Sequence, residues 1–131
     1  MEIQSTGSLC FHREGKPIFI FNKKSYDLHC SKHQLLKEKW FLEEVEKTLF
    51  YPDVITQGLQ KKIRIYYKVI KSHNTQYDIW VNVVRVPVIF HRNKKSKNIG
   101  FIKSAHDRWG FSDQIIHPIE KRIWENQKSL I

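Results

Sequence analysis

Two short apolar runs near the start of the chain predict a β-hairpin. The runs cover residues 9–12 and 17–21, and the pair Glu14-Gly15 lies between them. A glycine in a short connection favours the tight turn that joins antiparallel strands. We therefore predict two paired strands in this region, with the turn at Glu14 and Gly15.

The spacing of apolar residues changes to a helical period in the segment 35–50. Ser31, followed three residues later by Gln34, matches a capping box that would begin a helix. Pro52 would end it, because proline disfavours helical geometry in the residue before it. The pattern also allows a break near Trp40, which would give two helices. The apolar residues that recur at roughly helical spacing are Leu36, Trp40, Val45 and Leu49.

Alternation and apolar runs predict three further strands, at residues 63–70, 77–86 and 99–105. The second is apolar on both faces, which is typical of a central strand. Pro87 follows it and lacks a backbone donor, which predicts a bulge or the end of the strand. The segment 72–75 predicts the turn between the first two strands. In the first strand, Ile63, Ile65, Tyr67 and Val69 would point to one face, and Arg64, Tyr66, Lys68 and Ile70 to the other.

The order of these elements predicts an α+β fold. Pro118 suits the first turn of a last helix, in which Ile119, Ile123 and Trp124 would face the core. We expect residues 1–131 to form one domain, with an N-terminal hairpin and helix packed on an antiparallel β-meander and a C-terminal helix. The sheet face away from the helix would carry the polar side of the strand 63–70, and Ser104 and His106 would join it from another strand.

Positive charge is concentrated in residues 61–108. This segment holds twelve Lys and Arg residues against two acidic ones, Asp78 and Asp107, so it accounts for the formal net charge of +10 of the whole chain. Because the same segment predicts strands, the charge should lie on a folded surface rather than on a tail. Aromatic residues lie among the basic ones, and such a surface indicates a polyanionic partner, most often nucleic acid.

Composition limits the other classes of protein. A chain of 131 residues fits one domain, and no apolar run approaches the ~20 residues of a membrane span. The N-terminus lacks the basic and apolar regions of a signal peptide. Two cysteines, Cys10 and Cys30, do not form a disulfide framework, so we expect a cytoplasmic protein with reduced thiols. The sequence has no Cys-x-x-Cys pair, and we expect neither a metal nor a cofactor.

Histidines and four short motifs follow one another in a fixed order between about residues 26 and 110. His29 and His33 precede the acidic amphipathic helix. The motifs are LFYPDVI (49–55), IYYK (65–68), IWVNVV (79–84) and IKSAH (102–106). In order and spacing, this arrangement resembles the barnase–EndoU–colicin E5/D–RelE group of small nucleases, especially its phage-borne and polymorphic-toxin branches.

The resemblance implies a chemical activity. Nucleases of this group work without a metal and make the RNA 2′-hydroxyl attack the neighbouring phosphate. A general base accepts the hydroxyl proton, cations stabilise the transition state, and an acid protonates the leaving oxygen. The resemblance therefore implies a toxin-like endoribonuclease, with RNA as its substrate and an acidic antitoxin or immunity protein as a partner.

We expect His29, His33, Lys68 and Ser104 to be catalytic. His33 is the first choice for the acid or base, because imidazole titrates near neutral pH, and His29 would lie one helical turn away. Lys68 would stabilise the transition state beside Tyr66 on the same strand face. The resemblance implies that Ser104 hydrogen-bonds the phosphate, as the last-strand hydroxyl does in the group.

Further basic and aromatic residues would bind the RNA. Tyr66 would stack on a base, and a basic loop at 92–98 would contact phosphates. His106 and Arg108 flank the last strand, and either would be able to replace a helix histidine in the site. The expected nucleic-acid-binding residues are Arg64, Tyr66, Lys94, Lys95, Lys97, Lys103, His106 and Arg108.

Two other functions stay open. The same basic sheet would serve a non-catalytic nucleic-acid-binding module, in which the histidines are solvated and Lys68 is an ordinary exposed lysine. It would also serve a protein-interaction subunit whose basic face meets an acidic partner. Convergence of Lys68, Ser104 and one histidine in a single cleft would favour the enzyme. Histidines on the far side of the sheet from Lys68 would favour binding.

Overall fold

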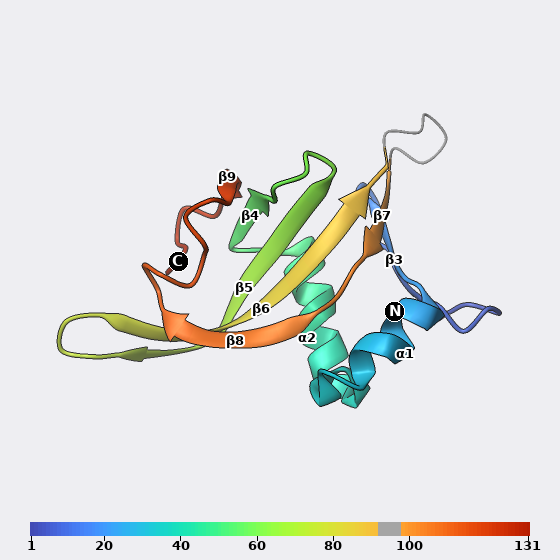
Figure 1. Ribbon diagram of the computed structural model, residues 1–131, viewed down its shortest axis with the longest axis horizontal. Helices are drawn as coiled ribbons and strands as arrows, with labels where there is room; N and C mark the ends of the chain where they lie inside the picture. Colours follow the sequence, from blue (N-terminus) through green and yellow to red (C-terminus); the bar gives the residue numbers. More distant parts are fainter. Residues whose placement is uncertain (92–97) are drawn as a thin grey trace.

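A long hairpin of two strands forms the centre of the molecule (Figure 1). The computed structural model describes residues 1–91 and 98–131, and within them the chain forms an α+β fold with two α-helices and a mixed sheet of nine strands. The strands are β1 (Glu2–Ile3), β2 (Leu9–Phe11), β3 (Ile18–Phe21), β4 (Val54–Gln57), β5 (Ile63–Asn74), β6 (Ile79–Phe90), β7 (Ile99–Ile102), β8 (His106–Phe111) and β9 (Lys121–Glu125). The helices are α1 (Lys23–Cys30), the short 3-10 helix η1 (Gln34–Lys37) and α2 (Lys39–Phe50). The strand order is β1-β2-β3-β7-β6-β5-β4-β9, and β8 pairs with β6.

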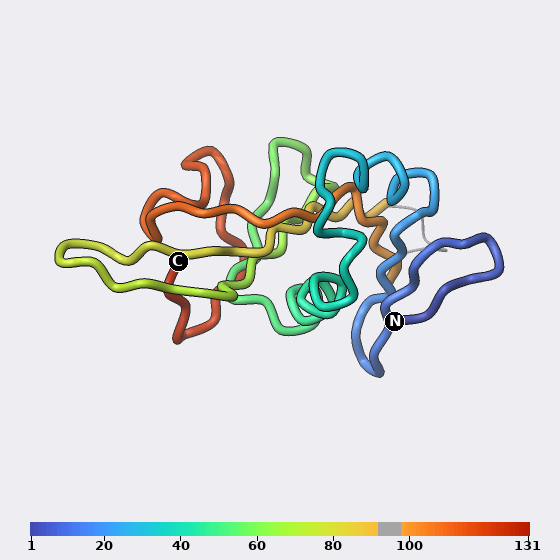
Figure 2. Tube along the Cα trace, turned by 90° about the horizontal axis from the view of Figure 1, so that it is seen from below, coloured from blue at the N-terminus to red at the C-terminus, as the bar shows by residue number. Residues whose placement is uncertain are grey.

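The two central strands, β5 and β6, extend further than the sequence predicts. The predicted turn at 72–75 is wrong, because β5 continues to Asn74. The chain instead reverses between Thr75 and Asp78, where the Thr75 hydroxyl donates to the Asp78 carbonyl at 2.6 Å. The tip of this hairpin projects beyond the rest of the sheet (Figures 1 and 2).

One edge of β6 is shared by two shorter strands. β7 pairs with the end of β6 and β8 with its first half. The strand predicted at 99–105 is shorter in the structure, because β7 ends at Ile102, and β8 was not predicted. Pro87 lies at the gap between them, where its carbonyl accepts from the Lys103 N–H at 2.9 Å. The Pro87 nitrogen, which carries no hydrogen, faces the same gap. No hydrogen bond between strands is therefore lost. β6 therefore continues through Pro87, and the predicted end or bulge there is wrong.

The predicted N-terminal hairpin is confirmed, since β2 and β3 pair antiparallel. β3 also pairs in parallel with β7, with Ile18 opposite Ile99, so the sheet is mixed rather than a purely antiparallel meander. Gly100 lies at this junction. A Cβ atom there would lie 2.6 Å from Val88 and 3.1 Å from Phe19, so only glycine allows β7 to pack this closely.

The helical region begins earlier than the sequence predicts. α1 starts after Asn22, whose side-chain oxygen accepts from the Lys24 N–H at 3.0 Å and caps the helix. Ser31 comes after the end of α1, and its hydroxyl donates to the Leu28 carbonyl. The capping box predicted at Ser31 is therefore wrong, and the first helix of the region lies before it.

α2 covers one face of the sheet, behind the strands in Figure 1. It ends at Phe50, as Pro52 predicts. Trp40 is half exposed, contrary to prediction, because Phe41 takes the inward position. The core on this face includes Phe41, Val45, Leu49, Tyr66, Val84, Val86 and Val88.

This packing reverses the predicted assignment of faces in β5. Tyr66 is 5% exposed and lies in the core beneath α2, so Arg64 and Lys68 are on the helix side of the sheet. The opposite face carries a second core, which includes Val54, Ile65, Tyr67, Val81, Val83, Ile115 and Ile116. The alternation of β5 is predicted correctly, but alternation does not determine which face a helix covers.

The C-terminal segment forms a strand, so the predicted C-terminal helix is wrong. β9 pairs antiparallel with β4, with Trp124 opposite Ile55. Ile119, Ile123 and Trp124 are exposed rather than in the core. The edge of β4 supplies backbone hydrogen-bond partners, whereas a short helix with few apolar contacts would be marginal.

Candidate functional site

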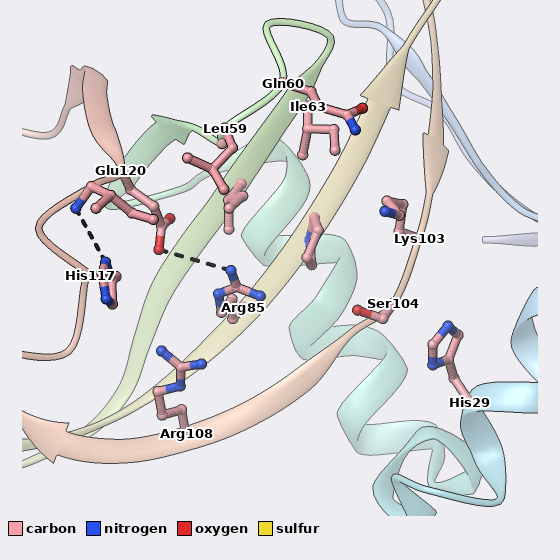
Figure 3. A pocket seen from close by; sticks show the side chains of 14 residues that line it. His29, Leu59, Gln60, Ile63, Arg85, Lys103, Ser104, Arg108, His117 and Glu120 are labelled. Carbon is pink, nitrogen blue, oxygen red and sulfur yellow. Dashed lines mark hydrogen bonds and ion pairs between the residues drawn. The ribbon is translucent and has the colours of Figure 1, made fainter.

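A pocket of about 670 Å³ lies on the sheet face opposite α2 (Figure 3). β5 and β6 form its floor, the β7–β8 connection forms one side, and the segment before β9 forms the other. Its polar lining is His29, Gln60, Arg85, Lys103, Ser104, Arg108, His117 and Glu120. Its remaining lining is Gly58, Leu59, Ile63, Ile65, Pro87 and Ile119. We call this the sheet-face pocket.

Arg85 lies on the floor of the pocket and is held by a buried polar network. Its Nε donates to the Tyr67 hydroxyl at 3.1 Å, and its Nη2 lies 3.9 Å from Oε2 of Glu120. The Glu120 side chain is 6% exposed and accepts from the hydroxyls of Tyr67 at 2.7 Å and Thr56 at 2.6 Å. Burial, the largest cause, raises the pKa of Tyr67 to about 12, so its hydroxyl stays a donor to the carboxylate. The network therefore fixes the Arg85 guanidinium in one orientation.

Two exposed cations and a hydroxyl lie around Arg85. Arg108 comes from β8, and its Nη1 donates to the Ile115 carbonyl at 3.4 Å. Lys103 and Ser104 come from the connection between β7 and β8, where the chain leaves the edge of β6. Three cationic side chains within one pocket give it a positive potential that favours an anionic ligand.

Three imidazoles stack at one edge of this pocket. The His33 ring lies between those of His29 and His106, with centroid distances of 6.5 Å and 5.1 Å. Burial is the main cause that lowers the pKa of His29. Burial first, and then the charge of Arg85, lowers the pKa of His106 to about 4. Both rings are therefore mostly neutral at neutral pH, and the Nδ1 atom of each is buried without a hydrogen-bond partner among the described residues.

A fourth imidazole, His117, lies on the other side of the pocket (Figure 3). Its Nδ1 accepts from the Ile119 N–H at 3.2 Å, so the hydrogen of the neutral ring is on Nε2. In Figure 3, Arg85 lies between His117 and Glu120 on one side and Ser104 and His29 on the other. The pocket thus combines a fixed cation with titratable groups at both ends.

The pocket brings together part of the predicted site. His29, Ser104, Lys103 and Arg108 line it, as expected for one shared site. His33 is outside the lining but stacks on His29.

Lys68 lies apart from these residues, on the α2 face, and its Nζ donates to the Tyr51 carbonyl at 2.9 Å. The predicted grouping of Lys68 with Ser104 and the histidines is therefore wrong.

The expected binding residues divide in the same way. Arg64 lies on the α2 face, with its guanidinium 5.2 Å from the Phe90 ring centroid. Tyr66 is buried, and burial raises its pKa, so it is not free to stack on a base as predicted. His106 is near the pocket through its contact with His33. The expected residues Lys94, Lys95 and Lys97 lie outside the described residues.

Sequence reasoning missed Arg85, His117 and Glu120. Arg85 was recognisable as a lone charge within an otherwise apolar central strand, since a buried charge requires a partner. Glu120 and His117 carried no such signal, because their positions depend on the pairing of β9 with β4 rather than on a local pattern.

Comparison with protein-family models, with curated proteins and with solved structures finds no match to this chain. In residues 1–91 and 98–131, no three His, Cys, Asp or Glu side chains are grouped so that they would hold a metal ion. No helix in the same ranges is long and apolar enough to span a membrane. The geometry of the pocket is therefore the evidence from which a function is inferred.

Proposed function

We propose that the sheet-face pocket cleaves RNA, and that the protein is a metal-independent, toxin-like endoribonuclease of the cytoplasm. The observation that carries this proposal is the position of His29 and His117 on opposite sides of Arg85 (Figure 3). Attack of a 2′-hydroxyl on a phosphodiester requires the base and the acid on opposite sides of the phosphorus. A phosphate bound at Arg85 would have one imidazole at each end.

Each polar residue of the pocket has a separate role in such a reaction. Neutral His29 accepts the proton of the 2′-hydroxyl as its oxygen bonds to phosphorus. His117 acts as the acid in its imidazolium form, in which Nδ1 has released the Ile119 N–H and taken up a proton. It gives the proton of Nε2 to the 5′-oxygen that leaves and returns to the neutral ring. Arg85 and Arg108 stabilise the charge on the phosphoryl oxygens, and Ser104 hydrogen-bonds one of them. The products are a 2′,3′-cyclic phosphate and a free 5′-hydroxyl.

Glu120 acts in this scheme as a positioning residue. Its oxygens accept from Thr56 and Tyr67 and face Arg85, so it is not free to accept a proton from a substrate. It holds the guanidinium in place before the substrate binds, which limits the reorganisation needed in the transition state. The isosteric Glu120→Gln variant keeps hydrogen-bonding capacity but loses the charge beside Arg85.

The test uses end-labelled single-stranded RNA incubated with the protein in EDTA. We expect cleavage that yields a 2′,3′-cyclic phosphate, and no cleavage of DNA of the same sequence, which lacks the nucleophile. Arg85→Ala should lower the rate about 10²–10³-fold, and His29→Ala about 10²–10⁴-fold.

The matched control is Lys68→Gln, on the other face of the same sheet, which should change the rate less than about twofold. Circular dichroism would confirm that each variant is folded. Loss of activity in Lys68→Gln with full activity in Arg85→Ala would contradict the proposed site.

A non-catalytic RNA-binding module is the second candidate. It is favoured by the separation of Lys68 from His29, because the two lie on opposite faces of the sheet. This function predicts that RNA stays intact but is retained on a filter, with retention falling steeply as salt increases.

The ribonuclease proposal also implies a partner. An active enzyme of this kind would need an inhibitor, and the cations of the pocket would favour an acidic one, an antitoxin or immunity protein. Such an inhibitor should compete with RNA for the wild-type protein, and it should bind the Arg85→Ala variant more weakly.

A further inference from the structure

A group of aromatic rings lies on the α2 face of the sheet, beyond the area that α2 covers. The register pairs Trp80 of β6 with His73 of β5 and with Phe111 of β8, which places the three side chains in one row. Asn82 pairs with Trp109 in the next row. Trp80 and Asn82 alternate with Val81 and share a face with Val84 and Val86, which pack beneath α2. We call His73, Trp80, Trp109 and Phe111 the aromatic surface.

The four rings contact one another in pairs, and three of them are exposed to solvent. The rings of His73 and Trp109 are nearly parallel, with an interplanar angle of 11° and centroids 6.3 Å apart. Trp80 meets Phe111 edge to face at 4.9 Å. Trp109 is 43% exposed, and His73 and Phe111 are also exposed. Such a concentration of exposed aromatic side chains in two adjacent rows of a sheet face is unusual in a protein that does not bind through them.

The surroundings of the aromatic surface favour an anionic partner. Lys71 pairs with Asn82 in the row of Trp109 and is exposed. Two nearby acidic side chains already accept hydrogen bonds: Asp107 from the Asn82 amide at 3.2 Å and Asp78 from the Ile79 N–H at 2.7 Å. His73 and Trp80 belong to the segment 61–108, which carries the formal net charge of +10 of the chain. A ligand with flat rings and negative charge fits these features, and unpaired nucleotides have both.

The aromatic surface is continuous with the sheet-face pocket across one strand. Arg108 of β8 lines the pocket, and the next residue, Trp109, points to the opposite face. In the described residues β8 pairs with β6 alone, so its outer side is an edge of the sheet. A strand bound at Arg108 would therefore reach Trp109 by crossing this edge.

We propose that the aromatic surface binds the bases of single-stranded RNA that passes around the edge of β8 from the sheet-face pocket. The proposal rests on the proposed function for the choice of RNA and for the path of the strand. Trp109 stacks on one base, His73 and Phe111 extend the platform, and Lys71 contacts the backbone. Stacking tolerates every base, so this surface adds affinity for long unpaired strands without strong sequence preference.

The test measures binding of a fluorescein-labelled, 12-nucleotide single strand with 2′-O-methyl riboses, which the protein cannot cleave. We expect Trp109→Ala to weaken binding in fluorescence anisotropy about tenfold, and Trp109→Phe to retain most of the affinity. The matched control is Trp124→Ala, because Trp124 is 46% exposed on the distant strand β9. Trp124→Ala should change binding less than about twofold. Binding of a duplex of the same sequence should not depend on Trp109, because the bases of a duplex already stack on one another.

The outcomes separate this proposal from the ribonuclease proposal. If RNA is not cleaved but the uncleavable strand binds with the expected dependence on Trp109, the aromatic surface is supported and the enzyme is not. If RNA is cleaved but Trp109→Ala binds the 12-mer as well as Trp124→Ala does, the aromatic surface is overturned and the enzyme stands. A dimer in sedimentation that Trp109→Ala dissociates would also overturn it, because a second copy would then occupy the surface.

Discussion

The two faces of the β5–β6 hairpin are built from the same alternating strands, yet they differ in content. On the α2 face, Tyr66, Val84 and Val86 meet a helix and form a dry core. On the other face, Tyr67 and Arg85 meet the C-terminal segment, which supplies Glu120 rather than a continuous apolar cover. A pair of strands therefore offers two surfaces. The segment that packs on each surface determines whether a closed core or an open pocket forms there.

The largest effect on stability should come from the α2 face of the sheet. Phe41 of α2 is fully buried, so Phe41→Ala should lower the free energy of unfolding by about 3–5 kcal/mol, through lost burial and the cavity that is left. Urea denaturation followed by circular dichroism would measure it. Leu59→Ala, at the exposed rim of the pocket, should cost less than about 0.5 kcal/mol. Equal losses for the two variants would mean that the two faces are packed alike.

The next effect concerns the charged network of the pocket. Arg85→Met removes the cation that faces the buried Glu120 carboxylate, and should destabilise the fold by about 3 kcal/mol. Adding Glu120→Gln to this variant should recover much of that loss, because no unpaired charge then stays buried. A double-mutant cycle in urea would give the coupling between the two residues. Additive effects would show that Arg85 and Glu120 do not interact.

Acid should weaken the pocket side of the sheet through His106. Its pKa is lowered from 6.5 to about 4 in the folded protein, so between these values the unfolded chain binds a proton that the folded chain does not. The stabilisation from the neutral ring is therefore complete above about pH 6.5 and is lost as pH falls toward 4.

Between pH 7 and 5 this amounts to about 1–2 kcal/mol after allowance for partial exposure. Stability measured at both pH values should show this loss, and His106→Asn should reduce it. His12→Asn, an exposed histidine on the opposite part of the sheet, should leave it unchanged. An unchanged pH dependence in His106→Asn would assign the loss to other groups.

The smallest effect tests the start of α1, which carries His29 to the pocket. Asn22→Ala removes the cap on the Lys24 N–H and should cost about 1 kcal/mol. Ser31→Ala should cost less, because Ser31 lies after the helix and caps no N–H group. Thermal unfolding of the two variants would rank them. A larger loss of stability for Ser31→Ala than for Asn22→Ala would indicate that Ser31 caps a helix, as the sequence pattern predicts.

The limits of sequence reasoning follow from these particular residues. Local patterns predicted the N-terminal hairpin, the end of α2 at Pro52 and the existence of the central strands, because each depends on neighbours in sequence. The end of β7 at Ile102, the separate strand β8 and the strand β9 depend on edges that are formed by distant segments.

The site shows the same division. His29 and Ser104 were predicted from motifs and do line the pocket. Lys68 was assigned to the site from alternation, which cannot distinguish the face that α2 covers from the open one. α1 itself was missed because it has eight residues, although Asn22 and the four-residue spacing of Tyr26 and Cys30 would have indicated it.

The parallel pairing of β3 with β7 has a consequence for synthesis of the protein. Ile18 pairs with Ile99, so this side of the sheet forms only after the chain has been synthesised as far as β7. At roughly 5–20 residues per second, the ribosome needs several seconds to make the intervening chain. During that time the nascent hairpin exposes an unsatisfied apolar strand, which is a natural binding site for a chaperone and a risk for aggregation.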